Sequence, residues 1–457
     1  MQADLAIKGG TVVSAVARRQ AHVYITDGIV LAVGTEELES HRVVDASDLL
    51  VLPGMVDSHV HLMDPGDTSR EDFPSGSAAA AVAGVTTIIE HTHQHPVRNS
   101  GDLVAKRAHL EGRTHVDYGL AAHVWPDDID GLGDLWSAGV AFFKLFTCTT
   151  HGVPGLVGDD LERALETIAS CGGIALVHAE DDAMTREAER RLRDQGRDDS
   201  SLLVEWRSRE AELAAVAEVC RIVNDTGVNA NIAHVSSSEV AEIVIRSRVG
   251  GADIGAEACP HYFALREDEV HTQGPLRKFT PPARARTDVE AERMWELLRS
   301  GAFTHVSTDH APSTLAQKDS GIWDAPFGLP GLDTTFPFLI DAALRGRIDI
   351  EDVVRLYSES PARRYGLYPG KGSLRPGSDA DVVLVDPEGS WQVRDEDVIS
   401  KAGWTPYRGR TWLGRVRASY LRGELIASER APTDLAGGIF LPGMGAKAAD
   451  TFSARGG

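Results

Sequence analysis

The chain has 457 residues, of which 42% are hydrophobic, and its 46 Lys+Arg against 68 Asp+Glu give a formal net charge of −22 at pH 7. This acidic balance argues against nucleic acid and anionic membrane surfaces as partners, because both would repel the protein. The first residues, MQADLAIKGGTVV, lack a basic segment followed by a long apolar core, and no stretch approaches the apolar length of a membrane span. We therefore expect a cytoplasmic protein that acts on a small molecule.

Residues 1–52 contain short β-type runs separated by Gly and Asp turns, which predict the first part of a small β domain. From residue 53 to 371, apolar strands alternate with amphipathic helices, a pattern typical of repeated βα units around a parallel sheet. The candidate strands are 55–59, 85–90, 116–122, 140–145, 174–178, 229–234, 252–257 and 303–307. Helices are expected between them, including one long helix over 204–223. The fold class is therefore α/β, with a (β/α)8 TIM barrel.

Residues 372–430 return to a β pattern with turn signals, and we expect them to join residues 1–52 in a small β-sandwich built from both chain ends. Residues 431–457 are rich in Gly, Ala and Pro, which predicts a loosely ordered tail or an arm onto a neighbouring subunit. The cysteines have no CxxC spacing, so free thiols are expected at Cys148, Cys171, Cys220 and Cys259.

Several predicted barrel strands end on a side chain that can bind a metal ion. His59 and His61 lie two residues apart and so share one face of a strand. His178 and His234 end two later strands, and Asp309 directly follows the last one. A single histidine at a strand end is usually a structural residue, but active sites of barrels lie where the strands end. The joint placement predicts a site for divalent metal with N and O ligands.

Lys144 stands in the sequence AFFKLF, where Phe142 and Phe146 share its face of the strand. Burial among aromatic rings lowers the pKa of a lysine and frees a neutral amine, which can react with carbon dioxide. The resulting carbamate would act as a carboxylate that bridges two cations. The alternative is a lysine with a buried stem whose ammonium pairs with an acid, and the residues alone leave both interpretations open.

Six motifs, DSHVHL, FFKLF, VHAE, AHVSS, CPHY and STDHAPS, resemble those of the cyclic amidohydrolases. That group comprises dihydroorotases, allantoinases, hydantoinases and dihydropyrimidinases, and the stretches ACPHYFAL and IWDAPFGLPG are most similar to allantoinases. The resemblance implies two divalent ions, with zinc as the expected metal, and a homotetramer. It implies that His59, His61 and Asp309 hold one ion, that His178 and His234 hold the other, and that carbamylated Lys144 bridges them.

The chemistry expected of such a site is the hydrolytic opening of a cyclic amide or ureide. A hydroxide between the ions attacks the ring carbonyl, because metal binding lowers the pKa of water to roughly 7. Asp309 accepts the proton and returns it to the leaving nitrogen. A structural role for Asp309, as a helix cap or ion-pair partner, stays open at this stage. So do two other functions: a non-catalytic scaffold relative, and a hydrolase of a different amide bond.

The substrate is less well specified than the reaction. The resemblance implies that dihydroorotases bind the substrate carboxylate with an Arg, an Asn and a His, where this chain has Met63, the segment EHTHQHP and Ser313. This difference argues against dihydroorotate, although Arg70 and Arg98 remain possible replacements. Allantoin or a related ureide or imide is therefore the leading substrate class, with dihydroorotate as the alternative.

Hydantoinases, by the same resemblance, use a Tyr for the reaction oxyanion, and the matching segment here offers Thr149 and Thr150 instead. Thr280 occupies a position where relatives contact the cyclic amide. Gly331 is expected to let the chain approach the ligand closely, unless it is an ordinary turn glycine. Three further histidines, either pocket-lining or structural, are His91, His93 and His95.

Overall fold

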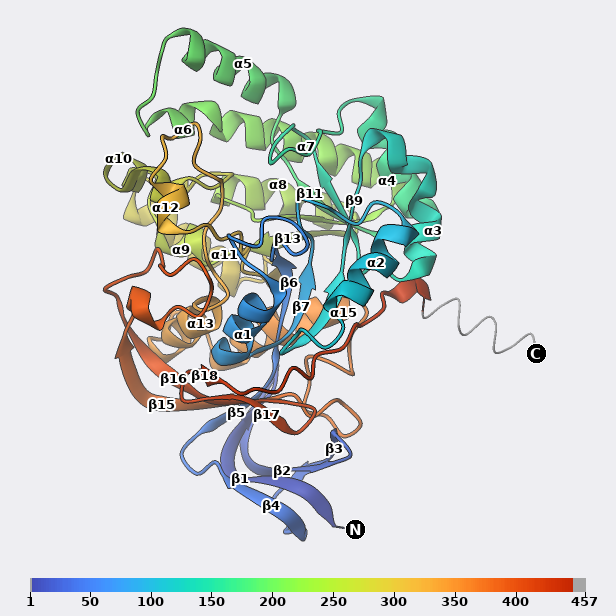
Figure 1. Ribbon diagram of the computed structural model, residues 1–457, viewed down its shortest axis with the longest axis vertical. Helices are drawn as coiled ribbons and strands as arrows, with labels where there is room; N and C mark the ends of the chain where they lie inside the picture. Colours follow the sequence, from blue (N-terminus) through green and yellow to red (C-terminus); the bar gives the residue numbers. More distant parts are fainter. Residues whose placement is uncertain (1, 447–457) are drawn as a thin grey trace, which may run out of the picture.

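The computed structural model describes residues 2–446, which form a barrel and an attached β domain (Figure 1). The barrel strands are β6 (Met55–Val60), β7 (Val85–Glu90), β8 (Asp117–Leu120), β9 (Ala122–His123), β10 (Phe143–Phe146), β11 (Ile174–His178), β12 (Asn229–Ile232), β13 (Ile254–Ala258) and β14 (His305–Val306). They pair in parallel in the order β6-β7-β8 and β9-β10-β11-β12-β13-β14. Each observed strand overlaps a predicted one, and β8 and β9 are two halves of one predicted strand.

The barrel closes between its last and first strands through contacts of side chains and backbone. The hydroxyls of Ser58 and Ser307 lie 2.9 Å apart, and the amide of His61 donates to the carbonyl of His310 at 2.8 Å. These contacts confirm the predicted barrel. They also bring the segment after β14 beside the end of β6.

The helices pack around the barrel. Their bounds are α1 (Phe73–Ala83), α2 (Ser100–Leu110), α3 (Leu132–Ala138), α4 (Asp159–Ser170), α5 (Asp182–Asp194), α6 (Leu202–Trp206), α7 (Arg209–Thr226), α8 (Ser238–Val249), α9 (His261–Ala264), α10 (Glu269–Gln273), α11 (Asp288–Arg299), α12 (Leu315–Lys318), α13 (Thr335–Leu344), α14 (Ile350–Val354) and α15 (Ser360–Arg364). The single helix expected over 204–223 is wrong: Ser208 caps α7 by accepting from the amide of Ala211, which separates α6 from α7. Across residues 2–446, none of the helices has both the length and the apolar character needed to cross a bilayer.

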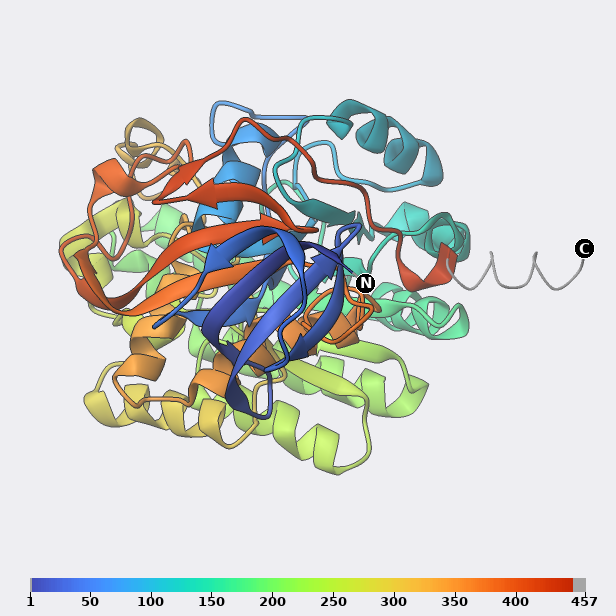
Figure 2. The same cartoon turned by 90° about the horizontal axis from the view of Figure 1, so that it is seen from below.

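The β domain contains strands from both chain ends in one sheet (Figure 2). Its strands are β1 (Ala3–Val13), β2 (Arg18–Thr26), β3 (Ile29–Gly34), β4 (Ser40–Asp45), β5 (Leu50–Pro53), β15 (Val382–Gln392), β16 (Thr411–Leu421), β17 (Glu424–Ser428) and β18 (Ala431–Pro432). The central strand β5 pairs with β1 on one side and with β15 on the other. Because β5 leads directly into β6, this sheet anchors the strand that carries His59.

The segment 433–446 differs from a loosely ordered tail, because it lies along the outside of the barrel. The amide of Tyr118 donates to the carbonyl of Ile439 at 3.0 Å, and the amide of Leu441 donates to the carbonyl of Tyr118 at 2.8 Å. A Cβ added at Gly443 would lie 2.0 Å from the carbonyl oxygen of Val140, so glycine permits this close approach. Residues 447–457 of the expected tail lie outside the described residues.

Candidate active site

The structure brings the predicted metal-binding side chains to one end of the barrel. His59 lies on β6 and His61 follows it, Lys144 lies on β10, and His178 ends β11. His234 and Asp309 lie on the loops after β12 and β14. All six line one pocket, together with His93, Phe146, His151, Thr280, Ala311 and Gly328.

The nitrogen and oxygen atoms of these side chains face one another. Asp309 Oδ1 lies 3.1 Å from His59 Nε2 and 3.3 Å from His61 Nε2. Lys144 Nζ lies 3.4 Å from the same His59 nitrogen, while His178 Nδ1 and His234 Nε2 are 2.9 Å apart. The ligand-type atoms therefore form two adjacent groups, one from β6 and Asp309 and one from His178 and His234.

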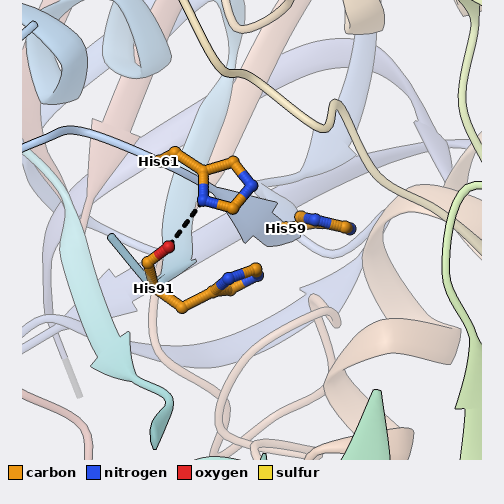
Figure 3. A group of neighbouring side chains, drawn as sticks. All are labelled: His59, His61 and His91. Carbon is orange, nitrogen blue, oxygen red and sulfur yellow. Dashed lines mark hydrogen bonds between the residues drawn. The ribbon is translucent and has the colours of Figure 1, made fainter. Parts of the chain in front are cut away.

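The outer ring nitrogens of three histidines have acceptors of their own. His59 Nδ1 donates to Glu257 at 2.7 Å, and His178 Nε2 donates to Glu180 at 2.7 Å. His61 Nδ1 donates to the carbonyl of His91 at 2.5 Å (Figure 3). An acceptor on the outer nitrogen fixes the tautomer and leaves the lone pair of the inner nitrogen free, as metal-binding histidines require.

Burial sets the protonation states that metal binding needs. It lowers the pKa of His61 to about 4 and lowers the pKa values of His178 and His234, so all three rings are neutral at pH 7. Burial opposes the charge of Asp309, but the neighbouring His59 and His61 keep the pKa of its carboxyl below the ordinary value. These three neutral imidazoles and the carboxylate are donors that suit a divalent ion.

Burial also lowers the pKa of Lys144 to about 8, which makes the neutral amine accessible near physiological pH. Among the residues that the structure describes, no carboxylate forms an ion pair with Lys144 within 4.0 Å. Its ammonium contacts His59 instead. Lys144 therefore has no acid partner at ion-pair distance among the described residues, while Glu257 and Asp309 act on its pKa from farther away.

Two of the ligand-type residues have strained backbone. His234 has φ of 37° and Asp309 has φ of 49°, in the left-handed region that residues with a Cβ seldom adopt. Such conformations cost about 1–3 kcal/mol each and persist only where the surroundings enforce them. Glu257 accepts from the amide of His234 at 2.9 Å, which is one such restraint.

The residues predicted to contact the substrate differ in where they lie relative to the pocket. Thr280 lines the same pocket as the six predicted metal ligands, and its hydroxyl donates to Glu180 at 2.7 Å. Met63 is buried beside the pocket and lines an adjoining cavity. Thr149 is exposed, with its hydroxyl accepting from the amide of Gly155 in its own loop.

Three more of these residues are buried outside the pocket wall. The hydroxyl of Thr150 lies 3.0 Å from His151 Nδ1, which places the threonine behind that ring. Ser313 is buried, and its carbonyl accepts from the indole of Trp404 at 2.8 Å. A Cβ at Gly331 would lie 3.1 Å from the side chain of Thr308, so close packing explains this glycine without a ligand.

The extra histidines have different surroundings. His93 lines the pocket and stacks on His151, with ring centroids 4.4 Å apart. His91 is buried behind His59 and His61, whereas His95 is exposed. Sequence reasoning missed His151 and Glu257. The usable signal for Glu257 was a carboxylate at the end of a predicted strand.

A sequence profile of the amidohydrolase family matches residues 50–405. The chain belongs to the amidohydrolase family. This amidohydrolase is 35% identical over 435 residues to an allantoinase from Rubrobacter xylanophilus, covering 93% of this chain and 94% of the relative. It is 36% identical over 383 residues to a dihydroorotase from Halobacterium salinarum, covering 83% and 86%.

Solved structures agree with this placement of the amidohydrolase. An L-hydantoinase (dihydropyrimidinase) from Arthrobacter aurescens superposes with a TM-score of 0.91 at 27% identity, covering 96% of this chain and 99% of that one. A D-hydantoinase structure gives a TM-score of 0.90 at 28% identity, covering 96% and 98%. The amidohydrolase therefore shares both the barrel and the attached β domain with these proteins.

Proposed function

We propose that this amidohydrolase opens a five- or six-membered cyclic ureide or imide by hydrolysis at a centre of two divalent ions, with zinc as the expected metal. His59, His61 and Asp309 would hold one ion and His178 and His234 the other, with a carbamate on Lys144 between them. When bound, the ions supply Lewis acidity and lower the pKa of water to roughly 7. The observation that carries the proposal is the inward lone pairs of histidines whose outer nitrogens already have acceptors.

A side chain of the protein would carry out the proton transfer. Asp309 is ionised at the pocket wall and would take the proton of the attacking water. The carbon–oxygen bond would form as the proton is taken, and Asp309 would return that proton to the ring nitrogen as the carbon–nitrogen bond breaks. Burial of the pocket strengthens these electrostatic interactions, because little water competes for the polar groups.

The individual substrate is proposed from the relatives. Allantoin is the first candidate, since allantoinases are among the matching proteins over nearly the whole chain. Dihydroorotate is the second, supported by the dihydroorotase match. A non-catalytic scaffold has less support, because the chain keeps a complete set of ligand-type side chains in one pocket. A cytoplasmic homotetramer is the proposed form of the enzyme, to be tested by light scattering and fractionation.

The direct test is a ring-opening assay of the metal-loaded protein, combined with elemental analysis. Allantoin, hydantoin, dihydrouracil and dihydroorotate are offered in parallel. We expect turnover of at least one compound by protein that contains two ions per chain. Two bound ions without turnover of any cyclic amide would contradict the proposed reaction.

A further inference from the structure

A second cavity of about 190 Å³ adjoins the pocket that the six predicted metal ligands line, and it shares His93 and His151 with that pocket. Its wall contains two cations, Arg70 and Lys278, together with Met63, Trp323 and Phe327. A cavity needs roughly 10–15 Å³ of such space to hold one water molecule, so this one is large enough for a short substituent on a ring bound next door.

Lys278 is a buried cation with unused donor capacity. The residue is 1% exposed, and Nζ lies 4.5 Å from the centre of the Phe327 ring and 5.6 Å from that of Trp206. One hydrogen bond, to the carbonyl of Trp323 at 3.1 Å, uses one of the three protons of the ammonium. No carboxylate of the described chain lies within 4.0 Å of this nitrogen.

Arg70 is half-buried and also has no carboxylate within 4.0 Å among residues 2–446. Its guanidinium donates to the carbonyls of Pro312 at 2.9 Å and Phe327 at 3.4 Å. Arg98, the other sequence candidate, is neutralised by Asp128, with Nε and Oδ2 2.5 Å apart. Lys278 and Arg70 are therefore two cations beside the active site that no carboxylate neutralises at ion-pair distance among the described residues.

We infer that this cavity is a binding site for a carboxylate on the ring substrate, with Lys278 and Arg70 as its cationic partners. The inference rests on the proposed ring-opening function and narrows its substrate class to cyclic amides or ureides that carry a carboxylate. Of the two candidate substrates it therefore favours dihydroorotate, which has a carboxylate, over allantoin, which has none. A buried charge without a counter-charge is costly, and an incoming carboxylate supplies the missing negative charge together with further hydrogen-bond acceptors. In dihydroorotases, the residues expected to bind the carboxylate stand at the positions of Met63 and Ser313. Lys278 and Arg70 would bind it from other positions in the chain.

The competing explanation is that both cations only hold the loop around residues 312–328 through its carbonyls. Lys318 separates the two explanations. It is equally buried, and its Nζ donates to the carbonyls of Lys278 at 3.0 Å and Pro326 at 2.8 Å. Lys318 does not belong to the cavity wall. It therefore supports the same loop without facing the proposed ligand.

The test uses substrate pairs that differ by a carboxylate-bearing group: hydantoin with hydantoin-5-acetate, and dihydrouracil with dihydroorotate. The readout is the ratio of kcat/KM for the carboxylated compound to that for the neutral one. We expect Lys278→Met and Arg70→Met each to lower this ratio by about 10- to 100-fold, mainly through KM, as for a lost charged hydrogen bond. Arg70→Lys should restore part of the loss. Lys318→Met should affect both members of a pair equally.

Equal losses on both members of each pair in Lys278→Met and Arg70→Met would overturn the inference, as would a wild-type protein without preference for the carboxylated compound. Calorimetric titration of the metal-loaded protein with hydantoin-5-acetate and hydantoin keeps the two proposals separate. Preferential binding of the acid, lost in Lys278→Met, would support the carboxylate site even if no ring were opened. Absence of that preference would reject the site whatever the reaction.

Discussion

Glu257 provides the sharpest test of how the metal centre is held, and its replacement by Gln is the perturbation. This buried carboxylate on β13 is not itself a predicted ligand. It accepts from His59 Nδ1 at 2.7 Å and from the amide of His234 at 2.9 Å, and so contacts one residue of each ligand group. Glu257→Gln keeps the size and one acceptor oxygen but removes the charge.

The expected effect follows from these two hydrogen bonds. A hydrogen bond to a charged group contributes about 1.5–3 kcal/mol and a neutral one about 0.5–1.5 kcal/mol. Loss of the charge should therefore reduce the free energy of metal binding by about 1–3 kcal/mol over the two hydrogen bonds. This corresponds to metal binding that is weaker by about 5- to 150-fold. This range agrees with the roughly 10- to 100-fold effects usual for partners of metal-binding histidines.

Metal affinity would be measured by competition with a chromophoric chelator, with circular dichroism to show that the variant is folded. Asp117→Asn is the matched control, since Asp117 is a buried carboxylate that pairs with Lys371 at 2.5 Å, away from the ligands. Lys371 keeps Asp379 and Asp381 as partners at 2.8 and 2.9 Å, so the control should fold. Metal affinity of Glu257→Gln within about twofold of wild type would refute the reasoning from these two charged hydrogen bonds.

Four further outcomes are expected. Asp309→Asn should keep its metal and lose nearly all turnover, and substantial remaining activity would show that another group moves the proton. ¹³C-bicarbonate should give a carbamate NMR signal in the metal-loaded wild type that is absent in Lys144→Met; a signal in both would place the carbamate elsewhere. The native protein should take up iodoacetamide at Cys171, the one half-buried thiol, and at the other three only after unfolding; native labelling of all four would disagree with their burial. Gly443→Val should lower the free energy of unfolding by about 1–3 kcal/mol, because its Cβ meets the Val140 carbonyl; an unchanged melting temperature would show that segment 433–446 does not pack there.

Much of the barrel was predictable because strands buried on both faces appear as short apolar runs between turn signals. The expected strand 174–178 matches β11, and 85–90 matches β7. The helix expected over 204–223 failed because Ser208 favours a cap over continuation of the helix, which the apolar pattern does not show. The Gly-, Ala- and Pro-rich composition of segment 433–446 also did not predict that it packs against the barrel, where its glycines lie close to backbone atoms of the barrel.

The sequence by itself determined the candidate metal-binding side chains and their places on or just after barrel strands, because residue type and strand periodicity are local properties. Tertiary structure alone decided what orients them. Glu257 reaches His59 across 198 residues of sequence, and the positive φ values of His234 and Asp309 depend on their neighbours in space. The cavity beside the pocket is likewise visible only after folding, because Arg70 and Lys278 come from opposite halves of the barrel sequence. Whether a cation has an acidic partner depends on the residues around it, and those surroundings exist only in the folded chain.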